Sequence, residues 1–291
     1  MQQCVRKFIE SIPNSALLLI DIGVWPFHDL LEKYPERAKN IGIFEPGTVS
    51  VAAGLALNGI IPIVYGINPF IVERAMEQLK LDFIYQKIGG NFVVSGGAYE
   101  FSTLGYSHYC PEDVAVLYSL PGFDILTPAN PKQFEVLWNA CANNDRPSFF
   151  RLTDYSCVTD IDTEYGKATV VKKGTKGLVI CVAETLDNVM IACKYLDVTV
   201  LFYSTLQPFD KITLINNLNE KIIIIEPFYA GTMAQIVLDN IDGACVSINS
   251  IGVPRKVIRN YGTKKEKDEY YGLTSKKLSE KICEYINKQK K

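Results

Sequence analysis

Histidine is scarce in this sequence, with two in 291 residues, and the eight cysteines stand singly. No two cysteines have the Cys-x-x-Cys spacing of a structural zinc site, and their scattered positions do not form the framework of a disulfide-stapled domain. We therefore expect no metal ligands in this chain. Most of the cysteines should be small buried hydrophobic residues in a reducing compartment.

Long apolar runs are also absent. No stretch approaches the ~18 residues that suggest a membrane span, and the first residues lack the basic and then apolar pattern of a signal peptide. The formal net charge is −2, so no basic field would attract a phosphate backbone. These absences predict a cytoplasmic protein whose partners are neither membranes nor nucleic acids.

The sequence does contain short β-branched runs that alternate with amphipathic segments. Hydrophobic residues make up 48% and charged residues 21%, and the length allows two domains with real cores. In the first half we predict strands at 16–22, 60–65, 92–95, 124–127 and 148–152, and helices at 72–84, 112–120 and 131–143. This pattern is typical of a doubly wound α/β domain with a mostly parallel sheet and right-handed crossovers.

The alternation lapses between 153 and 175 into polar and turn-forming residues, which predicts a domain boundary. We predict a first domain at 1–157, a linker at 158–175 and a second, smaller α/β domain at 176–291. Its predicted strands are 177–182, 198–202, 222–226 and 244–248, and its predicted helices are 186–195, 211–216, 232–241 and 275–287.

One acidic residue, Glu45, stands shortly before a run of small residues at 48–56 that predicts a helix. With Pro46 in the first turn, an acid here complements the partial positive charge of the helix N-terminus, which is an ordinary structural role. A catalytic role is the alternative, and it depends on the segments that follow.

Several segments occur in an informative order. The segment 40–47 reads Asn-Ile-Gly-Ile-Phe-Glu-Pro-Gly, and Asn68-Pro69-Phe70 and Ser107-His108 follow it. Further along are Ser-Thr-Leu-Gln-Pro-Phe-Asp at 204–210, Ile-Gly-Val-Pro at 251–254 and Tyr-Gly-Leu-Thr at 271–274. Together they resemble the pyrimidine-binding and C-terminal domains of transketolase-type thiamine diphosphate enzymes. Nearly the whole chain is similar to the C-terminal section of a split transketolase, which implies a subunit of a transferase that moves a ketol or acyl unit between sugar-like substrates.

The resemblance implies that Glu45 and Phe70 bind the cofactor. In the family, a carboxyl group at the position of Glu45 hydrogen-bonds N1′ of the aminopyrimidine and favours its imino tautomer, which then removes the thiazolium proton. We expect Ile43, Phe44 and Val49 to give Glu45 an apolar setting. Phe70 resembles the aromatic residue that stacks on the pyrimidine, and the alternative for Phe70 is an ordinary core position.

His108 and Arg74 match positions that face the substrate in the family. A histidine at position 108 can donate to a hydroxyl or carbonyl oxygen, although a histidine bonded to backbone at a helix start is the alternative. Arg74 matches a basic position that reads an anionic group in the related deoxyxylulose phosphate synthases. The alternative for Arg74 is an ion pair with Glu77 or Asp82.

Three positions depart from the family pattern. Leu104 stands where the family has an aspartate that reads a substrate hydroxyl, and Gly96 stands where a second substrate-binding histidine is frequent. Asp154 stands where the family has a phosphate-reading arginine, and a carboxylate there would repel a phosphate dianion. The departures predict a specialised substrate, for instance a nucleotide-linked or unphosphorylated sugar, in place of the common pentose phosphates.

The sequence contains no Gly-Asp-Gly segment, which in the family holds the cofactor diphosphate through a divalent ion. The resemblance therefore implies that a partner chain carries this motif and the Mg²⁺ or other divalent ion, with an active site between chains of an α2β2 assembly. Two alternatives stay open at this point. The chain could be the β subunit of a 2-oxo acid dehydrogenase or decarboxylase, or a regulatory or scaffold subunit without catalytic activity.

Overall fold

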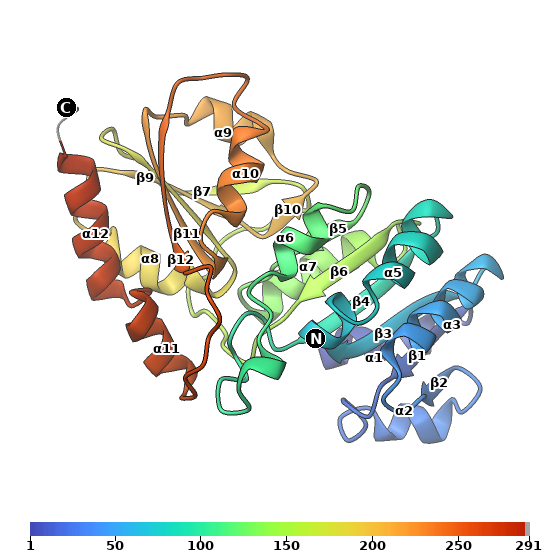
Figure 1. The fold of residues 1–291 in the computed structure, drawn as a ribbon. Coiled ribbons are helices and arrows are strands. Elements are labelled where there is room, and N and C mark those ends of the chain that lie inside the picture. The colour runs from blue at the N-terminus through green and yellow to red at the C-terminus, as the bar shows by residue number, and fades with distance from the viewer. Residues whose placement is uncertain (289–291) are drawn as a thin grey trace.

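The computed structural model describes residues 1–288, so the predicted second domain at 176–291 is described up to residue 288. Figure 1 shows two lobes, each built around its own sheet. The elements of the first half are α1 (Gln2–Ser11), β1 (Ser15–Leu19), α2 (His28–Lys33), β2 (Ala38–Asn40), α3 (Glu45–Leu57), β3 (Ile61–Ile67), α4 (Asn68–Val72), α5 (Met76–Gln78), a π-helix (Leu79–Tyr85), β4 (Gly90–Ser95), a 3-10 helix (Tyr106–His108), α6 (Asp113–Tyr118), β5 (Asp124–Leu126), α7 (Pro131–Cys141) and β6 (Pro147–Arg151).

The second half forms the other lobe and one further edge strand. Its elements are β7 (Ala168–Lys172), β8 (Leu178–Val182), a 3-10 helix (Ala183–Thr185), α8 (Leu186–Ala192), β9 (Thr199–Tyr203), β10 (Thr205–Gln207), α9 (Lys211–Asn216), β11 (Lys221–Tyr229), α10 (Thr232–Leu238), β12 (Ser247–Val253), α11 (Lys264–Tyr271) and α12 (Ser275–Asn287).

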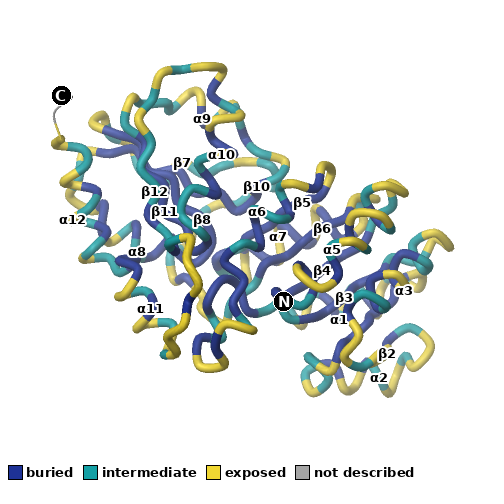
Figure 2. Tube along the Cα trace, viewed as in Figure 1, coloured by how far each residue is buried: buried dark blue, intermediate teal, exposed yellow. Residues whose placement is uncertain are grey.

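The first sheet has seven strands in the order β10-β5-β6-β4-β3-β1-β2, and all pairs except β10 with β5 are parallel. Alternate strand residues face opposite ways, so Leu18 and Val64 pack with α3, α4 and α6, whereas Leu17 and Ile63 pack with α1, α2 and α7. A sheet covered on both faces explains why its strands read as continuous apolar runs (Figure 2).

The second sheet has five strands in the order β12-β11-β8-β9-β7. Only β7 runs antiparallel to its neighbour, β9. Helices α9 and α10 cover one face of this sheet, and α8, α11 and α12 cover the other. The predicted fold class, two doubly wound α/β units with mostly parallel sheets, is therefore confirmed. No helix in residues 1–288 is long and apolar enough to cross a membrane.

The predicted division into a domain at 1–157, a linker at 158–175 and a domain at 176–291 stays a prediction. Two observations bear on it. Strand β7 lies inside the segment 158–175 that we predicted as a linker. Strand β10 belongs to the second half of the chain, yet it pairs with β5 at the edge of the first sheet. Sequence alternation could not reveal this pairing, because it joins residues about 80 positions apart in the sequence through backbone hydrogen bonds.

The helix predicted at 72–84 is wrong as a single element. Helix α4 begins earlier, at Asn68-Pro69, and turns at 73–75 separate it from α5 and the π-helix. Proline suits the first turn of a helix, where its missing N–H has no intrahelical partner. The break leaves Glu73 and Arg74 outside regular helix.

A buried arginine connects the two lobes. Arg151, the last residue of β6, donates from Nε to Asp113 at 2.8 Å and from Nη1 to Glu184 at 3.1 Å. Glu184 follows β8 of the second sheet, and the Arg151 guanidinium lies 5.1 Å from the ring centroid of Phe228 in β11. All three charged side chains are almost fully buried, so the ion pairs replace solvent for each of them.

Replacing Arg151 with Met should reduce the free energy of unfolding by about 3–5 kcal/mol, because Asp113 and Glu184 would be left buried without their counter-ion. Urea denaturation followed by circular dichroism measures this change. The control is Lys132→Met, since Lys132 pairs with Asp160 at the exposed surface and should contribute less than about 1 kcal/mol. Equal effects of the two substitutions would contradict a structural role of the buried bridge.

Candidate active site

Glu45 lies at the start of α3, and only 4% of its surface is exposed. The first turn is built locally. The backbone N–H and the hydroxyl of Thr48 both donate to the carbonyl of Phe44, each at 2.9 Å. Gly47 leaves room for the Phe44 ring, because a Cβ there would lie 2.0 Å from a ring carbon. These contacts hold the Glu45 carboxyl group at the inner side of the turn.

Arg74 pairs with Glu45. Its Nη1 lies 3.3 Å from both carboxylate oxygens, although about half of the Arg74 side chain is exposed. The alternative partners predicted for Arg74 are wrong for this structure, since Asp82 accepts instead from the Ser50 hydroxyl at 2.6 Å and Glu77 is exposed. The turn at 73–75 allows this pairing, because it carries Arg74 away from the axis of α4.

Phe70 stands between Arg74 and His108. The Arg74 guanidinium carbon lies 3.9 Å from the Phe70 ring centroid, within the range of a cation–π contact. The His108 ring meets Phe70 edge-on, with the centroids 5.1 Å apart. Asn68 fixes the start of this helix, since its amide donates to the buried carboxylate of Asp113 at 2.6 Å.

His108 ends the 3-10 helix that follows Gly105, whose φ of +85° favours glycine. Its Nδ1 lies 3.0 Å from the Ser107 hydroxyl, and its ring is 6.4 Å from the ring of Phe101. The structure thus brings together Glu45, Phe70, Arg74 and His108, the four candidate site residues predicted from the sequence. Their roles in binding and catalysis stay predictions.

The apolar setting expected for Glu45 is only partly present. Val49 is fully buried, but Ile43 is 70% exposed and Phe44 is 62% exposed. Both residues precede the helix and lie on its outer side, so they form a rim and not a cover. Leu104 adds to the exposed apolar surface at 54%.

The positions that depart from the family pattern have clear local surroundings. Gly96 has φ of +87°, and a Cβ there would lie 2.3 Å from the Phe101 ring, so a larger residue would not fit this backbone. Asp154 is exposed and lines a cavity of about 290 Å³ at the carboxyl ends of β3, β4 and β6, together with Tyr65 and Ser95. Among the described side chains that line this cavity Asp154 is charged and none is basic, while Met1, which carries the α-amino group, also lines it.

Glu100 connects two of these positions and was missed by the sequence analysis. Its carboxylate accepts from the backbone N–H of Gly96 at 3.1 Å and from the backbone N–H of Asp154. Burial raises the pKa of Glu100 to about 7. No sequence signal marks this residue, because its partners are backbone groups of two separate loops.

The residues present fit one half of thiamine diphosphate. A buried carboxyl group and a half-buried aromatic ring can hold an aminopyrimidine, and Glu45 and Phe70 supply both. For the diphosphate and its cation, the residues described at 1–288 offer one group of metal-ligating side chains, Glu73, Cys110 and Glu112, and a thiol is a poor ligand for Mg²⁺. This group of residues 73, 110 and 112 therefore does not fit the cation that accompanies the diphosphate.

Comparisons with known proteins identify the family of this chain. Residues 22–156 match the family described as transketolase, pyrimidine binding domain. An uncharacterized 33.6 kDa protein in the fasciation locus of Rhodococcoides fascians is 33% identical over 285 residues, which are 96% of this chain and 91% of that protein. An apulose-4-phosphate transketolase subunit of Phocaeicola vulgatus is 27% identical over 296 residues, which are 97% of this chain and 93% of that protein.

A solved structure has the same fold. The structure described as a split gene transketolase, inactive beta4 tetramer, superposes with a TM-score of 0.86 at 23% identity. The match covers 98% of this chain and 96% of that chain, so both lobes and their relative placement are shared.

The stability of the protein should fall as the pH rises from about 5 to 8. The pKa of Glu100 is raised above its ordinary value of 4.5, so folding favours the protonated carboxyl. Its contribution to stability is therefore fully present below pH 4.5 and is lost as the pH rises through about 7. Replacing Glu100 with Gln should flatten this dependence by up to about 3 kcal/mol.

Urea denaturation at a series of pH values measures the slope. The exposed Glu77→Gln variant serves as the control and should keep the wild-type slope. A Glu100→Gln variant with an unchanged slope would contradict the assigned effect of burial.

Proposed function

Because the chain belongs to the transketolase family as the C-terminal section of a split transketolase-like enzyme, we propose that it is the pyrimidine-binding subunit of a thiamine diphosphate-dependent transferase. The proposed reaction moves a ketol or acyl unit between sugar-like substrates. The observation that carries the proposal is the buried Glu45 carboxyl group, which pairs with Arg74 and through it is linked to the Phe70 ring and His108.

Each site residue has a proposed task. Glu45 holds N1′ of the pyrimidine by a hydrogen bond, and Phe70 provides the face on which the ring stacks. His108 lies edge-on to Phe70, so it can donate to an oxygen of a substrate bound beside the cofactor. When bound, the cofactor supplies the carbanion chemistry, and the protein contributes position and electrostatics.

In the free chain, Arg74 occupies the position proposed for the pyrimidine ring. One guanidinium group makes both contacts that the ring would need, since it pairs with Glu45 and stacks on Phe70. The half-exposed side chain of Arg74 is free to swing outward when a ring enters. In that position it would lie near the substrate, as expected from the family resemblance, and could contact an anionic group.

The diphosphate and its divalent ion belong to a partner chain in this proposal. Support comes from the missing Gly-Asp-Gly segment and from the exposed apolar side chains of Ile43 and Phe44 before α3, which a second chain would cover. The Phocaeicola vulgatus relative is described as one subunit of a transketolase, which supports an enzyme of more than one chain. We propose an α2β2 assembly located in the cytoplasm.

The proposed substrate differs from the common pentose phosphates. The proposal rests on the departures from the family pattern, since Asp154 is exposed where the family has a phosphate-reading arginine and Leu104 cannot hydrogen-bond a substrate hydroxyl. An unphosphorylated or nucleotide-linked sugar fits these surroundings better. Comparable turnover of ribose 5-phosphate and xylulose 5-phosphate by the assembled enzyme would refute this part of the proposal.

A native pull-down of the tagged chain in thiamine diphosphate and Mg²⁺ tests the two-chain enzyme. The expected result is a near-stoichiometric partner that carries Gly-Asp-Gly and a downstream asparagine. A chain that comes down alone as a homo-oligomer would contradict the proposal. Release of CO₂ from a 2-oxo acid by the complex would favour the dehydrogenase or decarboxylase alternative.

Within the co-purified complex, Glu45→Gln should lower the rate of transfer by about 10²–10⁴-fold, because an amide cannot offer a proton to N1′ as a carboxyl group does. Glu77→Gln is the control for the loss of one carboxylate elsewhere on the surface. Full activity of the Glu45→Gln complex would favour the scaffold alternative, in which this acid only starts a helix.

Replacing Arg74 with Met should strengthen binding of thiamine diphosphate to the complex by roughly tenfold, because no guanidinium contact of about 1–2 kcal/mol must be broken first. Isothermal titration calorimetry measures the dissociation constant without any turnover. The exposed Lys80→Met variant is the control. Weaker cofactor binding by Arg74→Met would contradict the proposal that Arg74 occupies the pyrimidine site only in the free chain. It would indicate instead that Arg74 contacts the bound cofactor.

A further inference from the structure

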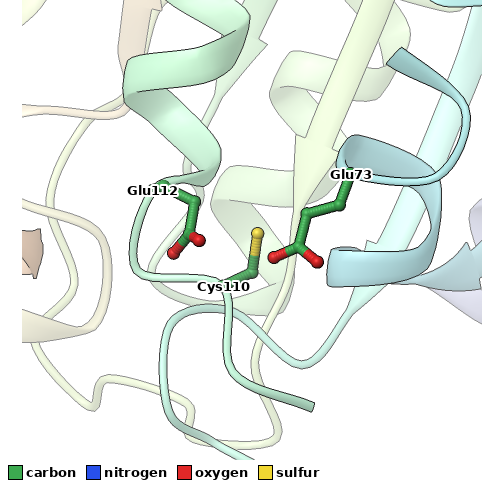
Figure 3. Close-up of side chains that lie close together, drawn as sticks. All are labelled: Glu73, Cys110 and Glu112. Atoms are coloured by element: carbon green, nitrogen blue, oxygen red, sulfur yellow. The ribbon is translucent and has the colours of Figure 1, made fainter. Parts of the chain in front are cut away.

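A second group of side chains that could bind a metal ion includes Glu73, the neighbour of Arg74 in the sequence. Glu73 follows α4, Cys110 follows the 3-10 helix that ends at His108, and Glu112 precedes α6. One ligand atom from each lies within 4.8 Å of the other two. Figure 3 shows both carboxyl groups turned toward the sulfur of Cys110. The cysteine and the two acids come from separate segments, so the fold assembles this group.

Among the described residues, one carboxylate oxygen of this group is enclosed without a partner, and the buried thiol of Cys110 forms a hydrogen bond only with Glu73. Cys110 is fully buried, and its thiol points into the space between the carboxyl groups. The Oε2 atom of Glu112 is buried and has no hydrogen-bond partner. The basic residue next in sequence, Arg74, pairs with Glu45 and not with Glu73. A buried carboxylate oxygen without a donor or counter-ion is costly, so such an atom requires an explanation.

Electrostatics favour a cation at this place. Burial raises the pKa of all three groups, and the neighbouring carboxylates raise the pKa of Cys110 and Glu112 further. A divalent ion would reverse this effect, because it stabilises the thiolate and both carboxylates at once. Glu73 is exposed, so the group is open to solvent on one side and an ion can enter.

The identity of the ligands selects the ion. A thiolate with two carboxylates suits zinc, whereas Mg²⁺ and Ca²⁺ prefer oxygen ligands alone. Ligands of a tetrahedral zinc ion, bound at about 2.0–2.3 Å, lie about 3.5 Å apart. The three atoms lie within 4.8 Å of one another, so rotation of the two glutamate side chains would bring them to this spacing.

We propose that Glu73, Cys110 and Glu112 bind one zinc ion, with water at the fourth position. This site is separate from the divalent ion that accompanies thiamine diphosphate, and it does not depend on the proposed transferase activity. The sequence analysis predicted no metal ligand here, because the three residues lack the regular spacing of known zinc motifs.

The zinc ion would have a structural consequence for the candidate active site. Glu73 lies three residues after Phe70, and Cys110 lies two residues after His108. Binding both ligands to one ion would therefore fix the segment that carries the stacking ring relative to the segment that carries the histidine. The ion would act as a positioning element and would not contact the substrate.

The test uses the full chain, stripped of metals and free of thiamine diphosphate, in a calorimetric titration with zinc chloride. The expected result is one equivalent bound with a dissociation constant in the micromolar range or below. Cys110→Ser and Glu112→Gln should weaken binding at least about 100-fold, since each removes a direct ligand. Glu73→Gln, a change at an exposed residue that should not impair folding, provides the same test if the buried variants are unstable.

Two controls separate this site from adventitious binding. The double variant Cys245→Ser and Cys283→Ser removes two exposed thiols and should still bind one equivalent of zinc as tightly as the wild type. Cobalt(II) should give a thiolate charge-transfer band in the wild type and in this double variant, but not in Cys110→Ser. Zinc binding that survives Glu73→Gln and Cys110→Ser unchanged, or that is absent from the wild type, would overturn the proposal.

Discussion

The buried carboxylate of Asp113 is the interaction on which the rest of the structure depends. It accepts from the Asn68 amide, which begins α4, and from Arg151, which ends β6 and reaches Glu184 in the other lobe. A single fully buried group therefore fixes the start of the helix that carries Phe70, the end of the last parallel strand β6 and the contact between the lobes. If Asp113 were apolar, the Asn68 amide and the Nε of Arg151 would lose their acceptor, and only the bond from Arg151 to Glu184 would remain.

Sequence patterns predicted those features that depend on neighbouring residues in the chain, namely individual strands and helix starts. Apolar runs revealed the parallel strands, and the acid before a proline-containing first turn revealed Glu45 at the start of α3. The sequence did not reveal contacts between distant segments, which include the pairing of β10 with β5 and the ion pair of Arg74 with Glu45. The sequence also did not predict that Ile43 and Phe44 are exposed, because their exposure depends on how α3 packs against the rest of the first lobe.

The candidate active site is complete on one side and open on the other. Its acid is buried and held by backbone contacts, whereas the residues expected to exclude water from it are exposed. An electrostatic interaction is weaker when water reaches it, so Glu45 and His108 would act most strongly once another surface closes over the rim. This asymmetry matches a chain whose chemistry requires a second polypeptide.

The position of β10 has a consequence for how the protein is made. Residues 205–207 complete the edge of a sheet whose other strands are all synthesised by residue 151. Until the ribosome has added those last residues, β5 presents unpaired backbone groups that could join another nascent chain. The two lobes are thus coupled during synthesis, and a polypeptide ending between them would leave the ribosome with an unprotected edge.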